Sequence, residues 1–467
     1  MAADIDGRST ELALRWVEET VGGVIVSNEI QRRWRPHHFL VIRQPSGNEI
    51  KVLLRGYRNP GFLDDDKGTR IRLEKEAAVL QALQSTDVRV PKFYGYNGDL
   101  GWLLMEWIEG DFLLTDVVDD ARRDRLFRQY LDNIAAMHRL DVESLHLPDV
   151  VPRPKDDEST LTDYHRENLA RFRTFAPGDP EPILEMGLNW VETHRPERPS
   201  RLSLCSGDIG PNQFFFVGDE VTSLFDLEMS RVTDPLFDLG MMRFRSMCYP
   251  IENLADYIRY YADRVWGALD VEILDYWTMV YLIGGALNMW DRVQRPDPST
   301  EDHFSLMAYD CIRRRGITEL FSQIYSIDLI PPDPPESTKS LHLRHEVLLQ
   351  RRLTEIEMPD AKSDPAREYR MRNSAALAEM LELSHEFGPS IDHQNLEELE
   401  SILGRRPSTI LDGLRSLSDL IAKQPDEHLE ARIQFLYRFQ VREEFLVAPI
   451  QRATGFASGV PLASFRD

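Results

Sequence analysis

The sequence has little cysteine. Cys205, Cys248 and Cys311 are the only three in 467 residues. They show neither CxxC pairing nor the spacing of a metal site, and an odd, sparse count offers no disulfide framework. Such usage is typical of a reducing compartment. Cys205 is interpreted as a small buried apolar residue, the usual role of a free cysteine. We therefore expect a cytoplasmic protein without disulfides.

Long apolar runs are also missing. The best candidate for a membrane span is the uncharged stretch from Tyr276 to Trp290, which Asp275 and Asp291 enclose. It is shorter than the roughly 20 residues that a spanning helix needs, and two glycines and an asparagine interrupt it. The N-terminus carries no basic region followed by an apolar run, so no signal peptide is expected. The pattern predicts a soluble protein with a buried core helix at 276–290.

Positive charge is scarce. Lysine and arginine number 55 against 78 aspartates and glutamates, which gives a formal net charge of −23. At long range this charge repels nucleic-acid backbones and anionic membrane surfaces, so we expect neither as a partner. A single anionic ligand is not excluded, because it needs only one local basic pocket.

The first 109 residues predict a small α+β lobe. Runs rich in β-branched residues, separated by polar turns, indicate antiparallel strands, and apolar residues at helical spacing indicate helices. The turn Asn97-Gly98 predicts a hairpin. In order, the expected elements are a helix at 10–18, strands at 24–28, 37–44 and 49–55, a helix at 69–83, and a hairpin of 93–96 with 102–108.

Residues 110–329 predict a second, mainly helical lobe. A strand-like interruption at 202–228 contains a short hairpin that turns at Gly218-Asp219. The expected helices lie at 120–140, 160–175, 181–194, 251–268, 271–290 and 302–326.

A proline-rich linker and a helical extension follow. Residues 331–335 read Pro-Pro-Asp-Pro-Pro, which cannot hold a helix, and we place a linker at 330–338. Residues 339–467 carry short apolar stripes at helical spacing and no motif to which chemistry can be attached. The stripes are expected to form ordinary core, and the next alternative is that they pack against the main body or against a second copy, so a homo-oligomer through this region is possible.

Two aspartates follow strand-like segments of the second lobe. The stretch SGDIGPNQFFF spans residues 206–216 and places Asp208 in a polar loop before three phenylalanines, and SLFDLE at 223–228 places Asp226 after the next strand. A surface turn would account for Gly-Asp and Gly-Pro taken alone, because these residues favour turns for steric reasons.

In this order, the parts resemble a known family of enzymes. Over roughly residues 10–325 the chain is similar to the aminoglycoside phosphotransferases and choline kinase-like small-molecule kinases, which have the bilobal protein-kinase-like fold. Their catalytic loop reads His-Gly-Asp, with Asn five residues after the Asp, followed by a strand, an Ile-Asp-Trp-Glu type segment, Gly-Asp-Pro and a further Asp-Leu. The corresponding residues here are Ser206-Gly207-Asp208, Gln213, Phe225-Asp226-Leu227-Glu228, Thr233-Asp234-Pro235 and Asp238-Leu239.

The resemblance implies a phosphotransferase that uses ATP and Mg²⁺ to phosphorylate a hydroxyl of a small-molecule alcohol. Phosphoryl transfer depends mainly on positioning and on neutralisation of charge. By resemblance, Asp208 accepts the proton of the acceptor hydroxyl. Asp226 binds Mg²⁺ and Gln213 takes the place of the second metal-binding amide. Glu228, expected on the same strand face two residues after Asp226, could touch metal or water, or be structural.

The small lobe supplies the expected nucleotide contacts. The resemblance implies that Arg55, at the end of its strand, is the cation on the phosphates and that Glu76 orients it, with Lys51 as a lesser candidate. The turn that covers the phosphates is placed near Ser27-Asn28.

Residues 103–110 resemble the hinge between the lobes. There the backbone of Glu106 and Ile108 would meet the adenine edge, and Met105 would guard the pocket. His138, near the end of a predicted helix, matches a recurring family position, and we assign it a structural role.

Two departures from the family pattern bear on activity. Ser206 replaces the usual His, and Gln213 replaces Asn. Because Gln is one methylene longer, its oxygen reaches an octahedral Mg²⁺ position only if the backbone shifts, and Asn212 could take the role instead.

Three functions remain open. The first is an active kinase, which the retained Asp208 and Asp226 favour. The second is a catalytically weak or inactive relative that binds nucleotide or metabolite as a regulator. The third is a scaffold that assembles through its helical extension. The acceptor stays unidentified. Residues 243–250 are interpreted as core with arginines at the surface, and they would suit a hydrophobic or anionic alcohol only if they face the cleft.

Overall fold

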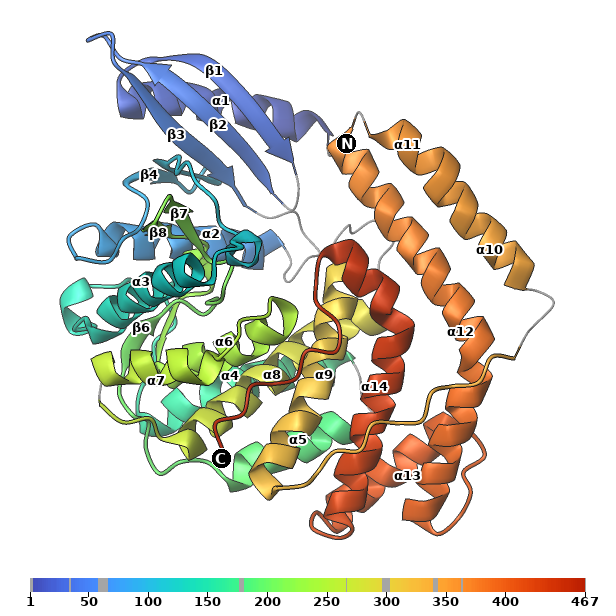
Figure 1. The fold of residues 1–467 in the computed structure, drawn as a ribbon. Coiled ribbons are helices and arrows are strands. Elements are labelled where there is room, and N and C mark those ends of the chain that lie inside the picture. Colours follow the sequence, from blue (N-terminus) through green and yellow to red (C-terminus); the bar gives the residue numbers. More distant parts are fainter. Residues whose placement is uncertain are drawn as a thin grey trace. The chain divides into compact units, whose positions relative to one another are not determined.

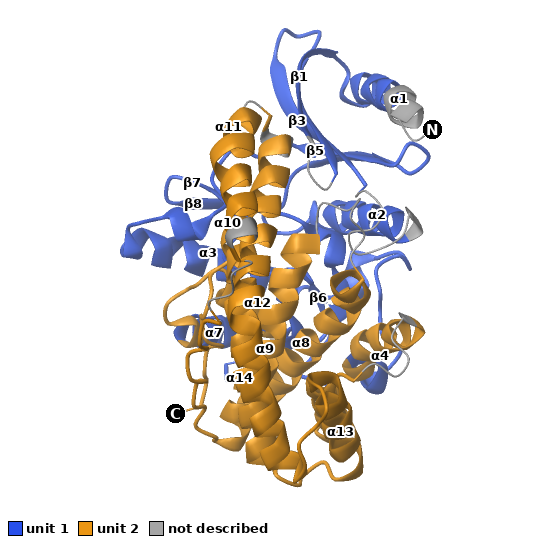
Figure 2. Ribbon diagram, turned by 90° about the vertical axis from the view of Figure 1, so that its right-hand side faces the viewer, with its two compact units in different colours: residues 1–160, 198–239, 256–269 blue, residues 161–197, 240–255, 270–467 orange. Residues whose placement is uncertain are grey.

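The computed structural model describes residues 3–32, 35–57, 66–175, 180–265, 267–295, 303–338, 343–362 and 364–466. Figure 2 shows that the chain forms two compact units. Unit 1 contains residues 1–160, 198–239 and 256–269, and unit 2 contains residues 161–197, 240–255 and 270–467. The lobe boundaries expected from the sequence, at 109/110 and 329/330, are not tested by this division and stay predictions.

Unit 1 begins with a five-stranded antiparallel sheet in the order β1-β2-β3-β5-β4 (Figure 1). Its elements are α1 (Ala3–Val21), β1 (Val24–Arg32), β2 (Pro36–Arg43), β3 (Glu49–Gly56), α2 (Asp66–Leu83), β4 (Phe93–Asn97) and β5 (Trp102–Glu106). Ala13 and Val17 of α1 pack against Leu40, Val52 and Leu104 of the sheet. Burial of these side chains explains why apolar residues alternate along the strands, since one face of the sheet is covered.

The rest of unit 1 holds short strand pairs among helices. β6 pairs with β9, and β7 pairs with β8 as the expected hairpin. The bounds are α3 (Asp120–Arg139), β6 (Ser203–Cys205), β7 (Phe214–Val217), β8 (Glu220–Leu224), β9 (Arg231–Thr233) and α7 (Leu254–Val265), with 3-10 turns at Leu114–Asp116, Glu143–Leu145 and Leu227–Met229.

Unit 2 is helical throughout its described regular elements. They are α4 (Asp157–Phe175), α5 (Pro182–Thr193), α8 (Val271–Gln294), α9 (His303–Tyr325), α10 (Leu343–Arg352), a π-helical turn (Leu353–Glu357), α11 (Met358–Ala361), α12 (Pro365–Leu403), α13 (Ile410–Lys423) and α14 (Leu429–Thr454). Within the described residues no helix combines the length and the apolarity that crossing a membrane requires. The apolar stretch 276–290 forms the buried centre of α8.

The helical extension packs against helices of unit 2, which agrees with the expected core and with packing against the main body. α14 lies against α9 and α12. The chain beyond α14 returns over α9 and α8 (Figure 1). There the Arg466 guanidinium lies 2.6 Å from an Asp275 oxygen, and Phe465 is buried. Assembly through this region stays a prediction.

Helix α6 (Leu236–Cys248) was not expected from the sequence. Nearly every residue along it is buried, so it lacks the alternation of polar and apolar faces by which a helix is recognised. The arginines of residues 243–250 are buried too, whereas the sequence suggested that they lie at the surface: Arg243 pairs with Asp275 at 2.8 Å.

The turn between β4 and β5 also differs from expectation. The hairpin is present, but its connection spans 98–101 and not the two residues Asn97-Gly98. The Gly101 amide donates to the Asn97 carbonyl at 2.8 Å, and Gly101 has a φ of +74°, which favours glycine.

Candidate active site

The loop after β6 carries Asp208, and the backbone conformation directly before it, at position 207, requires glycine. Gly207 has a φ of +72°, and a Cβ built there would lie 2.3 Å from the Met229 carbonyl oxygen. The loop therefore packs directly against the turn that follows Asp226. The side chain of Asp208 is half-buried.

Replacing Gly207 by alanine is expected to destabilise the protein and to displace the loop. The left-handed backbone alone costs an alanine about 1–2 kcal/mol, and the overlap with the Met229 carbonyl adds about 1–3 kcal/mol. Gly218→Ala is the matched control, since Gly218 has a φ of +58° but nothing lies within 4 Å of its Cβ position. Equilibrium urea unfolding of both variants measures the difference. Equal losses would show that the close approach at Gly207 has no effect.

Asp238 braces this loop from the start of α6. Its carboxylate accepts the amide hydrogens of Ser206 at 2.8 Å and Gly207 at 2.9 Å. His138 lies 3.1 Å from the same carboxylate through Nε2, and its Nδ1 contacts the Tyr261 hydroxyl. This arrangement agrees with the structural role expected for His138. It also holds the loop without a histidine at position 206.

His138, Cys205 and Asp238 lie close enough together to hold a metal ion. Their donor atoms are, however, already engaged. Both ring nitrogens of His138 and both Asp238 oxygens have hydrogen-bond partners, and the Cys205 thiol lies 3.6 Å from the Asp234 carbonyl oxygen. Burial, together with Asp238, raises the pKa of the Cys205 thiol far above its ordinary value. A thiol held protonated is a poor metal ligand, so we interpret this cluster as a brace.

Two amide side chains stand near Asp208. The Gln213 Nε2 donates to an Asp208 oxygen at 2.8 Å, which leaves the Gln213 oxygen for another contact. The Asn212 Oδ1 is buried and has no hydrogen-bond partner among the described residues. Carboxylate and amide oxygens are the donors that Mg²⁺ prefers. The residues present therefore fit a magnesium site, and either amide could complete it.

Asp226 follows β8 in the left-handed conformation, with φ 61° and ψ 49°. Few residues other than glycine adopt this conformation, and such residues concentrate at functional sites. Its side chain is 18% exposed. Glu228 was expected on the same strand face, but it lies on the 3-10 turn Leu227–Met229 and is buried.

Arg55 and Glu76 form the ion pair expected from the sequence. The Arg55 Nη1 lies 2.8 Å from Glu76 Oε1, and its Nη2 lies 2.5 Å from Asp226 Oδ1. Burial opposes the charge of Arg55, but Glu76, Asp226 and Glu228 outweigh it and raise the pKa of Arg55. Burial also raises the pKa of Glu76, against the opposing effect of Arg55 and Arg35. Arg55 thus joins β3, α2 and the segment of Asp226.

A second arginine in this cluster was missed from the sequence. Arg35 contacts Glu228, and its Nη1 lies 3.9 Å from Glu76 Oε2. The only sequence signal is the arginine-rich run Arg32-Arg33-Trp34-Arg35, which no periodic pattern singles out.

The prediction of a phosphate-covering turn near Ser27-Asn28 is wrong, and the case for Lys51 as a phosphate-binding cation is weakened. Ser27 and Asn28 are not in a turn, because they lie within β1 opposite Val41 and Leu40. The chain passes from β1 to β2 between Arg32 and Pro36 instead. Lys51 points away from the ion cluster, since it pairs with the exposed Glu109 at 2.5 Å.

The predicted hinge is continuous with β5. Met105 is buried in that strand. The Glu106 amide donates to the Lys92 carbonyl at 2.8 Å, so it is not available to a nucleotide. The carbonyl of Glu106 and the amide of Ile108 are therefore the groups that could form hydrogen bonds with a nucleotide base. Just beyond, Asp111 and Phe216 exchange backbone hydrogen bonds of 3.0 and 2.9 Å, so β7 is tied to the end of the hinge.

Two half-buried aromatic rings border this region. Phe215 and Phe225 lie with ring centroids 4.6 Å apart, and they stand near Gln213 and directly before Asp226 in the chain. Sequence reasoning did not single them out. A hollow of about 480 Å³ is lined by Gly110–Leu113, Asp116–Asp119, Arg122 and Phe216. Phe112 of this lining lies edge-on to both rings, with centroid distances of 6.2 and 6.3 Å.

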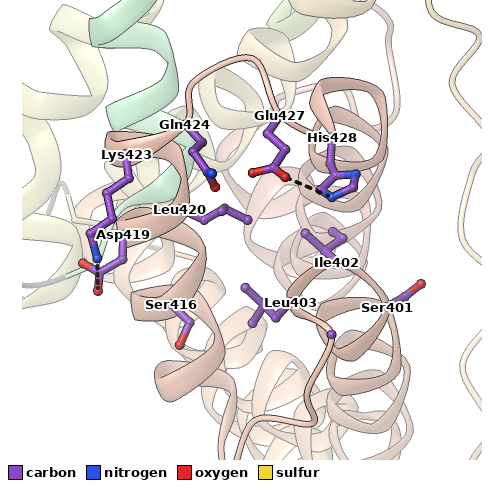
Figure 3. A pocket seen from close by; sticks show the side chains of 11 residues that line it. Ser401, Ile402, Leu403, Ser416, Asp419, Leu420, Lys423, Gln424, Glu427 and His428 are labelled. Carbon is purple, nitrogen blue, oxygen red and sulfur yellow. Dashed lines mark ion pairs between the residues drawn. The ribbon is translucent and has the colours of Figure 1, made fainter.

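Unit 2 has a hollow of its own, of about 550 Å³, at the ends of α12, α13 and α14 (Figure 3). Its ionisable side chains contact one another, Lys423 with Asp419 and His428 with Glu427, each at 3.8 Å. It contains none of the residues predicted for catalysis or nucleotide binding.

Comparison with known proteins bears out the resemblance. Residues 58–271 match the phosphotransferase enzyme family. A candidate aminoglycoside phosphotransferase from Ralstonia eutropha JMP134 is 19% identical, with a TM-score of 0.51 over 65% of this chain and 95% of that one. A choline/ethanolamine kinase family protein from Mesorhizobium loti is 15% identical, with a TM-score of 0.47 over 68% of this chain and 94% of that one. The α+β, kinase-like fold with added C-terminal helices is confirmed.

A curated relative matches over a short region. Subunit BUD32 of the EKC/KEOPS complex of Chaetomium globosum is 43% identical over 54 residues. The match spans 12% of this chain and a fifth of that protein's length.

Proposed function

We propose that this chain, whose residues 58–271 match the phosphotransferase enzyme family, transfers the γ-phosphoryl group of ATP to a hydroxyl of a small molecule with the help of Mg²⁺. The observation that carries the proposal is the pairing of Arg55 with both Glu76 and Asp226. A cation held between a helix carboxylate and a metal-binding carboxylate is the arrangement that phosphoryl transfer uses.

The residues that would hold Mg²⁺ are Asp226 and the amide oxygen of Gln213 or Asn212. When bound, the ion would neutralise charge on the phosphates. Arg55 would bind phosphate oxygens with the guanidinium that now contacts Asp226. Asp208, on its braced loop, would orient the acceptor hydroxyl and accept its proton.

For the nucleotide base, the chain offers a polar edge and an aromatic face. The carbonyl of Glu106 and the amide of Ile108 would recognise the purine edge beside Met105. Phe215 and Phe225 would supply the apolar surface, because aromatic rings stack readily on a flat base.

The acceptor is proposed only as an alcohol of a small molecule. The buried pair of Arg243 with Asp275 removes one of the basic groups that suggested an anionic acceptor. A cytoplasmic location, and assembly through residues 339–467, remain predictions of the sequence.

The proposal is tested by following ADP formation from ATP and Mg²⁺ in the presence of a broad panel of alcohols, including aminoglycosides, choline and sugar alcohols. We expect at least one alcohol to raise ADP formation well above the rate with water alone and to gain phosphate. If MgATP binds but no alcohol accepts phosphate, the kinase function is rejected in favour of the alternative, an inactive relative that binds nucleotide as a regulator.

A further inference from the structure

Arg35 comes from the connection between β1 and β2 and lies in the ion cluster. It directly precedes Pro36, the first residue of β2, and only 2% of its surface is exposed. Its guanidinium contacts Glu228, which lies 193 positions away in the sequence. The contact therefore links the start of β2 to the turn that follows Asp226.

The charges of the cluster show what this contact does. Two guanidiniums, Arg35 and Arg55, face three carboxylates, Glu76, Asp226 and Glu228. Of these five side chains only Asp226 retains appreciable exposure, so the others must neutralise one another rather than rely on water. Both terminal nitrogens of Arg55 are already engaged, one on Glu76 and one on Asp226. Glu228 is therefore neutralised by Arg35.

Loss of Arg35 would redistribute these contacts. The cluster would change from a net charge of −1 to −2, and Glu228 would stand buried without its arginine. Arg55 already interacts electrostatically with Glu228, so it is the nearest remaining cation for that carboxylate. A third carboxylate competing for Arg55 would draw it away from Asp226 and from incoming phosphates.

We propose that Arg35 is a positioning residue of the nucleotide site: by neutralising Glu228 it keeps Arg55 available for Asp226 and the phosphates. This inference rests on the proposed function, since it concerns the same site. Through Arg35, the start of β2 is tied by a charge contact to the segment proposed to bind metal.

The test is a cycle of three variants, Arg35→Met, Glu228→Gln and the double variant, with MgADP binding measured by calorimetry. Arg35→Met is expected to weaken MgADP binding at least about tenfold, since it leaves a buried carboxylate unpaired. Adding Glu228→Gln removes that carboxylate, so the double variant is expected to bind within about threefold of the unmodified protein. Arg35→Lys, which keeps the charge, should lose less than Arg35→Met.

Rescue is the outcome that distinguishes positioning from other roles. If Arg35 contacted the phosphates directly, removing Glu228 could not restore affinity, and a weakened double variant would overturn the inference. Unchanged binding by Arg35→Met would overturn it as well. If Arg35→Met does not fold, Arg35→Lys and the double variant decide in the same way.

The matched control is Arg43→Met on β2. Arg43 forms a solvent-exposed pair with Glu49 at 2.8 Å. Its loss should leave MgADP affinity unchanged, because exposed pairs contribute little. If the unmodified protein fails to bind MgADP, the proposed function fails and this inference with it. If the unmodified protein binds MgADP but the variants do not show the predicted loss and rescue, the inference about Arg35 is overturned and the proposed function is not.

Discussion

Asp208→Asn is expected to lower phosphoryl transfer by about 10²- to 10⁴-fold while MgATP binding stays within about twofold, since general-base catalysis contributes that range. Asparagine cannot take the proton of the acceptor hydroxyl. It keeps the shape of aspartate and can still accept the hydrogen bond that Gln213 now donates to Asp208. The rate is measured in single turnovers with excess enzyme and any alcohol found to accept phosphate, and the affinity by calorimetry.

Asp219→Asn provides the matched control for this substitution. Asp219 lies in the turn between β7 and β8, where its exposed carboxylate pairs with Arg125 at 3.2 Å. The same chemical change there should leave the rate unaltered. An Asp208→Asn variant that transfers phosphate within threefold of the unmodified protein would remove Asp208 from the role of base.

Arg55→Met is expected to reduce the free energy of unfolding by about 3–5 kcal/mol, the usual cost of removing one partner of a buried ion pair. Methionine fills most of the volume, so the loss reflects charge and not a cavity. It leaves Glu76 with Arg35 at 3.9 Å as its remaining cation. Equilibrium urea unfolding at pH 7 measures the loss.

The same variant is expected to lose more stability at high pH than at low pH. Burial already raises the pKa of Glu76, and Arg55 opposes that rise. Without Arg55 the pKa of folded Glu76 moves further above its unfolded value, so stability is retained below the unfolded pKa and is lost as the pH rises through the folded one. Unfolding at pH 5 and pH 8 should therefore differ more in the variant than in the unmodified protein.

Lys51→Met is the control for Arg55→Met: it tests whether the loss of stability comes from the buried cluster or from removing any positive charge on β3. Lys51 also lies on β3, but it is half-exposed and pairs with Glu109 at the surface. Exposed pairs contribute about 0–1 kcal/mol, so the control should change stability little. Similar losses from both substitutions would show that the Arg55 cluster is not a buried, mutually dependent set.

The parts of the site that could be predicted lie on elements with a clear period. Arg55 ends a strand of alternating residues and Glu76 lies in an amphipathic helix, so the family resemblance could assign both, and the structure brings them together. The loop of Asp208 and the hairpin of β7 and β8 were recognisable by their turn residues.

What could not be predicted depends on contacts distant in sequence or on full burial. Arg35 and Glu228 are joined across 193 positions, and no local pattern encodes such a pair. The 3-10 turn that carries Glu228 follows from the left-handed backbone of Asp226, which side-chain identity does not reveal. Helix α6 is buried on all sides, which removes the hydrophobic stripe that marks a helix.

The most direct test of the metal-dependent nucleotide site is thermal unfolding with Mg²⁺ alone, ATP alone, both together, and both with Asp226→Ala. A ligand that binds only the folded state stabilises it, by about 2.7 kcal/mol at a hundred times its dissociation constant. We predict that the melting temperature rises by several degrees with Mg²⁺ and ATP together and that Asp226→Ala abolishes the rise. An unchanged melting temperature under every condition would contradict the account and leave the kinase-like fold without a nucleotide site.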